Sequence, residues 1–168
     1  KLVAADIHDA GQLAALCAGQ CAVVNLIGIL NERGRSGRGF DRVHATLAGS
    51  LVEACRQERV DRLLHVSALN ADPDHGPSLY LRSKGRGERL IRDESGPDMR
   101  WTIFQPSVIF GPGDDFVNRF ARLLRAIPLG LPLARPGARF APVWVGDVVA
   151  ALQRALADEA TAGEIYEL

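Results

Sequence analysis

Residues 62–106 read RLLHVSALNADPDHGPSLYLRSKGRGERLIRDESGPDMRWTIFQP. The opening RLLHVSAL is a short, continuous apolar run, which is typical of a strand buried in a sheet. A polar loop that contains proline follows at 70–77, a helix is predicted over about 78–93, and RWTIF begins the next strand. A helix between two buried strands predicts a β-α-β crossover, in which the two strands lie parallel in one sheet.

The same alternation extends to both sides of this unit. CAVVNLIG at 21–28 predicts another strand buried on both faces, and apolar side chains four apart over 41–59 predict a helix. RWTIFQPSVIF at 100–110 reads as one strand, a helix is expected near Asp114, and residues 140–158 join a short strand to a last helix that begins near Gly146. We therefore expect an α/β fold with a Rossmann-like, doubly wound parallel sheet.

The composition indicates one globular domain. Of 168 residues, 47% are hydrophobic and 24% are charged, which is enough apolar material for one core. The 20 basic and 20 acidic residues balance, so no net charge draws in nucleic acid or an anionic membrane. No run reaches the roughly 18 apolar residues of a membrane span, and no leader is recognised. We expect a cytoplasmic protein with no nucleic-acid partner and no transmembrane segment.

The three cysteines and the arginine-rich segment suggest no site. Cys17, Cys21 and Cys55 are odd in number and form no C-x-x-C pair, so we expect buried, reduced thiols. The segment ERGRSGRGF at 32–40 is expected to be a flexible loop. We assign no metal ligands.

Three polar residues are expected to meet where the parallel strands end. Ser67 follows its strand, and Tyr80 and Lys84 lie four apart near the start of the next helix, so both share one helix face. A tyrosine with a pKa near 10 is a weak base at neutral pH, but a nearby ammonium favours its phenolate. A serine hydroxyl beside it can bond to a carbonyl or alcohol, so the trio suits proton transfer coupled to hydride transfer.

A solvated helix face is the alternative explanation for the Tyr80–Lys84 spacing. Y-x-x-x-K is a short motif that arises often by chance. This chain, however, holds only two tyrosines and two lysines, so the spacing arises by chance in about 2% of such sequences. Arginine supplies the other 18 of the 20 basic residues, which makes Lys84 an exception whose tunable ammonium suits phenolate activation.

Six blocks of the sequence resemble, in order, a known family. Ser67 and YLRSK at 80–84 resemble the short-chain dehydrogenase/reductase superfamily, in its extended and atypical NAD-dependent epimerase/dehydratase branch. Within it, the match is to the group that contains the NADPH-binding accessory subunit of respiratory complex I and its bacterial relatives. The blocks are VVNLIGIL, HVSALNAD, YLRSKGRGERLIRD, PSVIFGPGDDFVNRFARL, IPLGLPL and PVWVGDV.

The resemblance implies a bound dinucleotide, NAD or NADP, and a small-molecule substrate. It assigns catalysis to Ser67, Tyr80 and Lys84, and cofactor contacts to Asp6, Ile7, Asn25, Leu26, Gly28, Tyr80, Lys84, Pro106, Ser107 and Val108. Asp6 would bind the adenine amino group, the loop 25–28 would follow the ribose and pyrophosphate, and 106–108 would place the carboxamide. The whole chain, 1–168, would be part of an NAD(P)-binding Rossmann domain, with 111–142 contributing to a small substrate region.

Several of these residues have simpler interpretations. Asp6 suits a strand-end cap, Asn25 a turn stabilised by its side chain, and Asp147 a helix N-cap. His65 is expected to be a packed core histidine, and His44 stands where many extended members carry asparagine, so a proton-relay role for it is not assigned. Trp101 and Trp144 are expected in the core or a wall.

One element of the family pattern is missing from the sequence. The glycine-rich G-x-x-G-x-x-G turn that binds pyrophosphate at a helix N-terminus is not present. KLVAADIHD at 1–9 reads as a strand that ends at Asp6, so the fold is expected to lack its N-terminal βαβ portion. We expect a part of a protein of roughly 300 residues, and weak dinucleotide binding by these residues alone.

Two functions follow from this reading. The first is an NAD(P)-dependent oxidoreductase of the epimerase/dehydratase type that acts on a sugar nucleotide or a related alcohol or carbonyl compound. The second is a non-catalytic NAD(P)H-binding subunit or assembly factor of the respiratory complex I type, held near a membrane by its protein partner. The retained Ser67, Tyr80 and Lys84 favour the first, and the match to the complex I subunit favours the second.

Overall fold

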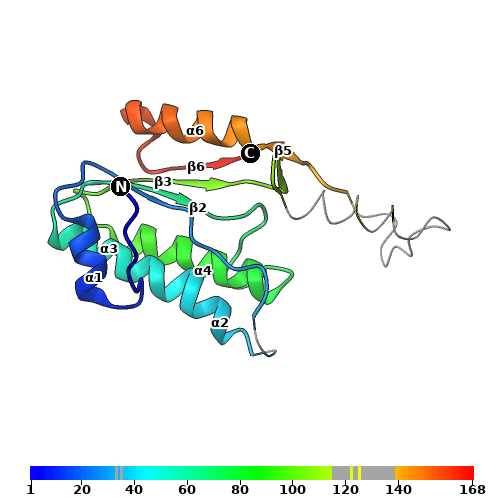
Figure 1. The fold of residues 1–168 in the computed structure, drawn as a ribbon, viewed down its shortest axis with the longest axis horizontal. Helices are drawn as coiled ribbons and strands as arrows, with labels where there is room; N and C mark the ends of the chain where they lie inside the picture. Colours follow the sequence, from blue (N-terminus) through cyan, green and yellow to red (C-terminus); the bar gives the residue numbers. More distant parts are fainter. Residues whose placement is uncertain (33, 35, 115–121, 123–124, 126–138) are drawn as a thin grey trace.

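A parallel sheet of four strands forms the centre of the molecule (Figure 1). The computed structural model describes residues 1–32, 34, 36–114, 122, 125 and 139–168. The strands are β1 (Val23–Asn25), β2 (Arg62–Val66), β3 (Arg100–Gln105) and β6 (Glu164–Glu167), in the spatial order β1-β2-β3-β6. All three pairings are parallel, with Asn25 opposite His65 and His65 opposite Ile103. The expected Rossmann-like parallel sheet is confirmed.

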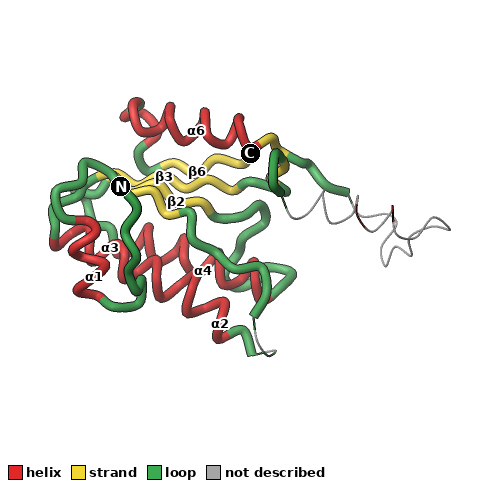
Figure 2. Tube along the Cα trace, viewed as in Figure 1, coloured by secondary structure: helices red, strands yellow, loops and turns green. Residues whose placement is uncertain are grey.

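Helices cover both faces of this sheet, as Figure 2 shows. One face carries α1 (Ala10–Cys17), α2 (Arg38–Asp41), α3 (Leu47–Gln57) and α4 (Leu79–Glu94), while α6 (Val145–Ala157) lies on the other. A π-helical turn (Arg42–Thr46) joins α2 to α3, and a 3-10 turn (Glu159–Thr161) precedes β6. A second, two-stranded sheet pairs β4 (Ile109–Phe110) with β5 (Val143–Trp144). This places helices on both sides of the sheet, as in a doubly wound fold.

Local sequence explains where the main helices begin. The Ser78 side chain accepts a hydrogen bond from the Leu81 N–H at the start of α4, and Asp9 does the same for Gln12 at the start of α1. The apolar face of α3 then packs with strand residues into a core that includes Leu47, Leu51, Val52, Cys55, Leu63, Ile91 and Ile103. This core fixes the positions of β2 and β3 relative to α4.

Helix α4 meets its neighbours mainly through small and polar residues, and Ile91 is its buried apolar contact with the core. Its buried residues are Ser83, Lys84, Gly85, Gly87, Glu88 and Ile91. A Cβ atom on Gly87 would lie 2.4 Å from the His44 carbonyl oxygen, and one on Gly85 would lie 2.4 Å from the Pro73 nitrogen. The two glycines therefore allow backbone to approach backbone, and they bring polar side chains of α4 under the sheet.

Several element predictions are corrected. KLVAADIHD forms no strand, and β6, which no pattern predicted, lies beside β3. β1 spans only three residues at the edge of the sheet, where Val24 is 38% exposed, so this strand is not buried on both faces. Pro106 interrupts the predicted strand 100–110 and separates β3 from β4. The helix expected near Asp114 lies outside the described residues.

Some single-residue predictions are also settled. His65 is a buried core residue, as expected, and Trp101 packs against the core, whereas Trp144 is 51% exposed. Cys17 and Cys55 are buried but Cys21 is exposed. Asp147 lies in the first turn of α6, whose N-cap position is Trp144, so Asp147 is not the cap. Among the described residues, no helix is both long and apolar enough to cross a membrane.

Candidate dinucleotide and catalytic site

A cleft of about 780 Å³ opens at the carboxyl ends of β1, β2 and β3. Three loops that follow these strands form its walls, together with the first turns of α4 and the segment 139–141. This is the edge at which parallel α/β sheets bind ligands. Its lining residues are Leu26, Gly28, Ile29, Leu30, Val66, Ser67, Ala68, Leu69, Asn70, Ser78, Tyr80, Leu81, Lys84, Pro106, Ser107, Val108, Ile109, Arg139, Phe140 and Ala141.

Ser67, Tyr80 and Lys84 all line this one cleft. Ser67 follows β2 directly and is 4% exposed, and its N–H donates to the Phe104 carbonyl at 2.7 Å. Its hydroxyl makes no hydrogen bond of ordinary geometry to any described residue. A buried hydroxyl without a partner is costly. The wall of the cleft therefore presents a polar group that a ligand can satisfy.

Lys84 lies beneath the cleft with its ammonium held to the backbone of β2. The side chain is 4% exposed, and Nζ donates to the Val66 carbonyl oxygen at 2.9 Å. Burial lowers the pKa of Lys84 to about 8, although the charge of Glu88 acts in the opposite direction. Lys84 is therefore an ammonium at neutral pH that can release its proton in mildly alkaline solution.

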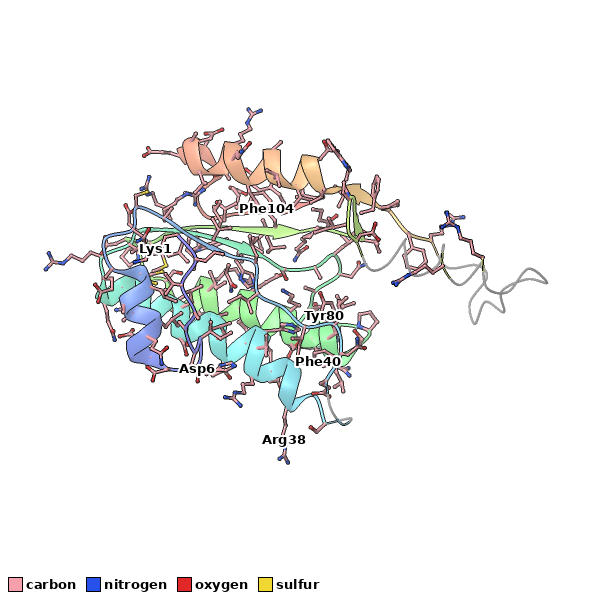
Figure 3. The ribbon with its side chains drawn as sticks, in the orientation of Figure 1. Lys1, Asp6, Arg38, Phe40, Tyr80 and Phe104 are labelled. Atoms are coloured by element: carbon pink, nitrogen blue, oxygen red, sulfur yellow. The ribbon has the colours of Figure 1, made fainter. Side chains whose placement is uncertain are left out.

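Tyr80 is half-buried and lies near Phe40 (Figure 3). The Phe40 and His44 rings meet the Tyr80 ring edge to face, at centroid distances of 5.9 and 5.3 Å. Burial raises the pKa of Tyr80 above its ordinary value. The expected lowering of this pKa by Lys84 is therefore not found here, because removal from water disfavours the phenolate.

A buried carboxylate, Glu88, lies one turn after Lys84 on α4 and was not predicted. It is 4% exposed, and its two oxygens accept hydrogen bonds from Gln105 Nε2 at 2.9 and 3.0 Å. Burial raises the pKa of Glu88, while the nearby Ser67 hydroxyl, Gln105 and the charge of Lys84 lower it. The spacing of four from Lys84 is the signal in the sequence that could have revealed it.

The residues expected to contact the cofactor divide into two groups. Those on the cleft are Leu26, Gly28, Tyr80, Lys84, Pro106, Ser107 and Val108. Asp6, Ile7 and Asn25 do not line it. Asp6 is exposed, its carboxylate accepts the His8 N–H at 2.9 Å, and it is well separated from Tyr80 in Figure 3. Its adenine contact stays a prediction, and its observed role is to stabilise a turn.

Asn25 shapes the loop above the cleft without lining it. Its side chain is buried, and Oδ1 accepts the Ile27 N–H at 3.0 Å, which is the turn-stabilising role given as the alternative. Its Nδ2 lies 3.0 Å from His65 Nδ1, which ties β1 to β2. Burial lowers the pKa of His65 to about 3, so this histidine is neutral and accepts at Nδ1.

Gly28 allows the loop after β1 to approach α4 closely. A Cβ atom at this position would lie 3.4 Å from Lys84 Nζ and 3.5 Å from His44 Nε2. The space that a side chain would fill is thus left open beside the ammonium. Together with the buried Ser67 hydroxyl, this open space leaves room and a polar group for a ligand bound in the cleft.

Other residues on or near the cleft were missed by sequence reasoning. Glu32, placed in a flexible loop, accepts the N–H groups of Gly37 and Gly39 at 2.6 and 2.9 Å and so organises the start of α2. His44 contacts both Ile29 and Ser83, and its position in a helix gave no sign of these contacts. Asn70, Arg139 and Phe140 do line the cleft, from irregular segments whose placement no periodic pattern reveals.

The chain resembles curated mitochondrial proteins of respiratory complex I. It is 34% identical over 146 residues to the NADH-ubiquinone oxidoreductase 40 kDa subunit of Neurospora crassa, a match that covers 87% of this chain and 36% of that protein. It is 33% identical over 149 residues to NADH dehydrogenase [ubiquinone] 1 alpha subcomplex subunit 9 of Mus musculus, covering 86% of this chain and 37% of that protein. The chain thus spans well under half the length of these relatives.

Solved structures with the same fold include two sugar-nucleotide enzymes. A UDP-glucuronic acid 4-epimerase from Bacillus cereus, in complex with UDP-glucuronic acid and NAD, matches with a TM-score of 0.83 and 18% identity, over 97% of this chain and 58% of that chain. A dTDP-glucose 4,6-dehydratase from Streptomyces venezuelae with NAD bound matches with a TM-score of 0.76 and 24% identity, over 97% and 56%. These matches establish the fold.

The match to a sequence family covers the strand-end loops that form the cleft. The NAD(P)H-binding family matches residues 1–115, which include the loop after β1, Ser67, Tyr80, Lys84 and 106–108. This is more than half of the 168 residues. The chain therefore belongs to the NAD(P)H-binding family.

Proposed function

We propose that the protein to which this chain belongs holds NAD(P)(H) in this cleft and uses Ser67, Tyr80 and Lys84 for chemistry at a C–OH or C=O group of a sugar nucleotide or a related compound. The convergence of the three side chains on one cleft carries this proposal. When bound, the dinucleotide supplies a hydride acceptor or donor. The residues of the chain carry out all other steps.

Each residue has a distinct part in this proposal. Ser67 offers a buried hydroxyl beside Glu88 that can donate to a substrate oxygen. Tyr80 exchanges the proton of that oxygen, and Lys84 provides the positive charge that favours the phenolate and can bond to the ribose hydroxyls. Because Lys84 keeps its positive charge only below its pKa of about 8, this support of the Tyr80 phenolate applies at neutral pH and is lost in alkaline solution.

The second candidate function is a non-catalytic dinucleotide-holding subunit. Both curated relatives described above carry names of complex I subunits, which supports a respiratory-complex partner and a peripheral position at a membrane. The raised pKa of Tyr80 also suits a site whose residues bind without turnover. In this case Lys84 and the Ser67 hydroxyl act as ligands of the dinucleotide.

One experiment on the full-length protein separates the two functions. Bound NADH or NADPH is followed by fluorescence, and conversion of nucleotide sugars and carbonyl compounds is followed by product analysis, for wild type and Tyr80→Phe. An enzyme loses at least roughly a hundredfold of its turnover in Tyr80→Phe while binding persists. Binding with no turnover in either protein supports the second function, and no binding of either dinucleotide contradicts both.

A further inference from the structure

A buried carboxylate lies close to the cleft without lining it. Glu88 is 4% exposed and does not belong to the residues that form the cleft walls. It lies on α4 one turn after Lys84, and its neighbours Ser67 and Gln105 follow β2 and end β3. A carboxylate is rarely buried in this way unless opposite charge or hydrogen bonds compensate it. Its surroundings therefore link it to the elements that build the cleft.

The hydrogen bonds of Glu88 and Lys84 are made to neutral partners. Gln105 Nε2 donates to both carboxylate oxygens of Glu88, at 2.9 and 3.0 Å. Lys84 Nζ donates to the Val66 carbonyl oxygen at 2.9 Å. These bonds satisfy part of the hydrogen-bonding capacity of each charged group, but they bring no opposite charge to it. The charges of Lys84 and Glu88, one helical turn apart, therefore compensate each other.

Each of these two groups changes the pKa of the other. Burial lowers the pKa of Lys84 to about 8, and the charge of Glu88 raises it. Burial raises the pKa of Glu88, and the charge of Lys84 is among the contributions that lower it. Without the carboxylate, the buried ammonium would therefore release its proton at a lower pH.

The other titratable groups that face this pair in the described part of the chain supply no unpaired negative charge. Burial favours the neutral form of three of them, because it lowers the pKa of the histidines and raises that of the tyrosine: His44, His65 and Tyr80. Arg92 of α4 is a cation, and the Asp41 carboxylate of α2 pairs with Arg86. Glu88 is thus the buried carboxylate that opposes the charge of Lys84.

We propose that Glu88 is a positioning residue, whose carboxylate keeps the Lys84 side chain in its charged form at the dinucleotide site. It does not line the cleft, so it acts through Lys84. The proposal rests on the proposed function in one respect, namely that Lys84 is a ligand of the dinucleotide. Its consequence is that Glu88 sets the upper limit of the pH range in which the cleft binds NAD(P)(H) tightly.

One substitution removes this charge and keeps the size of the side chain. In Glu88→Gln the amide oxygen can still accept a hydrogen bond from Gln105, so the connection between α4 and β3 is retained. Glu94→Gln is the matched control, because Glu94 is an exposed glutamate on the same helix. His75→Gln, at an exposed histidine that does not line the cleft, controls for a group that titrates elsewhere.

The first measurement follows Lys84 itself and needs no ligand. In the full-length protein, the ¹³Cε signal of Lys84, assigned by its loss in Lys84→Met, reports the protonation of this side chain as the pH is raised. We expect a midpoint of about 8 in wild type and in both controls. In Glu88→Gln we expect a midpoint lower by about one pH unit. An unchanged midpoint in Glu88→Gln would overturn the proposal.

The second measurement is the dissociation constant of NADH and NADPH as a function of pH. In wild type, we expect affinity to fall roughly tenfold as Lys84 loses its proton. Glu88→Gln should show the same fall at a pH lower by about one unit, and its affinity should return to the wild-type value near about pH 6. A defect in folding or packing would not be reversed in this way. An equal loss of affinity at every pH contradicts the proposal.

If Glu88→Gln fails to fold, the reciprocal effect decides. Because the interaction between two titrating groups is mutual, Lys84→Met should raise the midpoint at which the ¹³Cδ signal of Glu88 titrates. Equal Glu88 midpoints in wild type and Lys84→Met would show that the two charges do not interact, and the proposal would be wrong. If wild type binds neither dinucleotide, the proposed function fails, but both ¹³C titrations still test the link between Glu88 and Lys84.

Discussion

The two walls of the cleft differ in how deeply their residues are buried. On the side of β2, β3 and α4, Ser67 and Lys84 line the cleft and Glu88 lies one turn further along α4, each 4% exposed. The opposite wall follows the edge strand β1, where Leu26 is 65% and Leu30 is 74% exposed. The first wall is fixed by the core, whereas the second depends on a few specific bonds from Asn25 and His44. The wall with Ser67 and Lys84 is thus preformed, and the wall after β1 relies on single side chains.

The largest expected effect concerns the buried ammonium of the first wall. The pKa of Lys84 is about 8 in the folded protein and near 10.4 when unfolded, so the unfolded chain binds more protons between these values. The free energy of unfolding should therefore gain up to roughly 3 kcal/mol from this residue as the pH rises from 8 to 10.5. Denaturant unfolding of wild type and Lys84→Met across this range measures the gain.

For Lys84, the quantity to compare is the difference in free energy of unfolding between wild type and Lys84→Met at each pH. Burial raises the pKa of Cys55 to about 12, which makes wild type lose stability in part of the same range. Subtracting the Lys84→Met curve cancels this contribution. Parallel curves for the two proteins would mean that Lys84 is not desolvated, and the first wall would then be no more buried than the second.

A pair of glycines compares the two walls directly. Gly87→Ala places Cβ 2.4 Å from the His44 carbonyl oxygen, a backbone atom, whereas Gly28→Ala places it 3.4 Å from the end of the Lys84 side chain. We expect Gly87→Ala to lower the free energy of unfolding by about 2 kcal/mol and Gly28→Ala by well under half of that, with a loss of dinucleotide affinity in its place. An equal loss of stability in Gly87→Ala and Gly28→Ala would contradict the difference between the two walls.

A smaller effect is expected for the polar group that supports the edge strand. Asn25→Ala removes the partner of His65 Nδ1 and the acceptor of the Ile27 N–H, so it should cost about 1–2 kcal/mol. Protection of the Ile27 amide from hydrogen exchange should fall in the same variant. If stability and protection both stay at wild-type values, Asn25 does not hold the loop, and the account of the second wall is wrong.

The smallest effect is expected at the exposed edge. Leu26→Ser changes a side chain that is 65% exposed, so the free energy of unfolding should change by less than about 0.5 kcal/mol. Thermal melting of this variant beside Asn25→Ala provides the comparison. A loss as large as that of Asn25→Ala would indicate that Leu26 is buried against another part of the full-length protein.

The periodic spacing of apolar residues in the sequence correctly predicted individual strands and helices. The strand 62–66 and the helix 79–94 were found because their patterns and the Ser78 cap are local. The strand β6 was missed because EIYE is exposed at every residue and short, and it is defined by its pairing with β3. The first nine residues read as a strand from their apolar letters, although no neighbouring strand pairs with them in the described residues.

The site was predictable where residue chemistry is distinctive. Ser67, Tyr80 and Lys84 could be placed together from strand ends and helical spacing, and the structure puts them on one cleft. His44 and Glu88 could not, because their roles come from burial and from partners 15 to 39 residues away. The raised pKa of Tyr80 also depends on burial, which the sequence does not display.

The most direct test of the account is the dissociation constant of NADH and NADPH for the full-length protein, measured for wild type, Lys84→Met and His75→Gln. If the cleft holds the dinucleotide, wild type and His75→Gln bind at least one of the two with equal affinity, and Lys84→Met binds it roughly tenfold or more weakly. Equal affinity in all three proteins would place the dinucleotide elsewhere and contradict the assignment of this cleft.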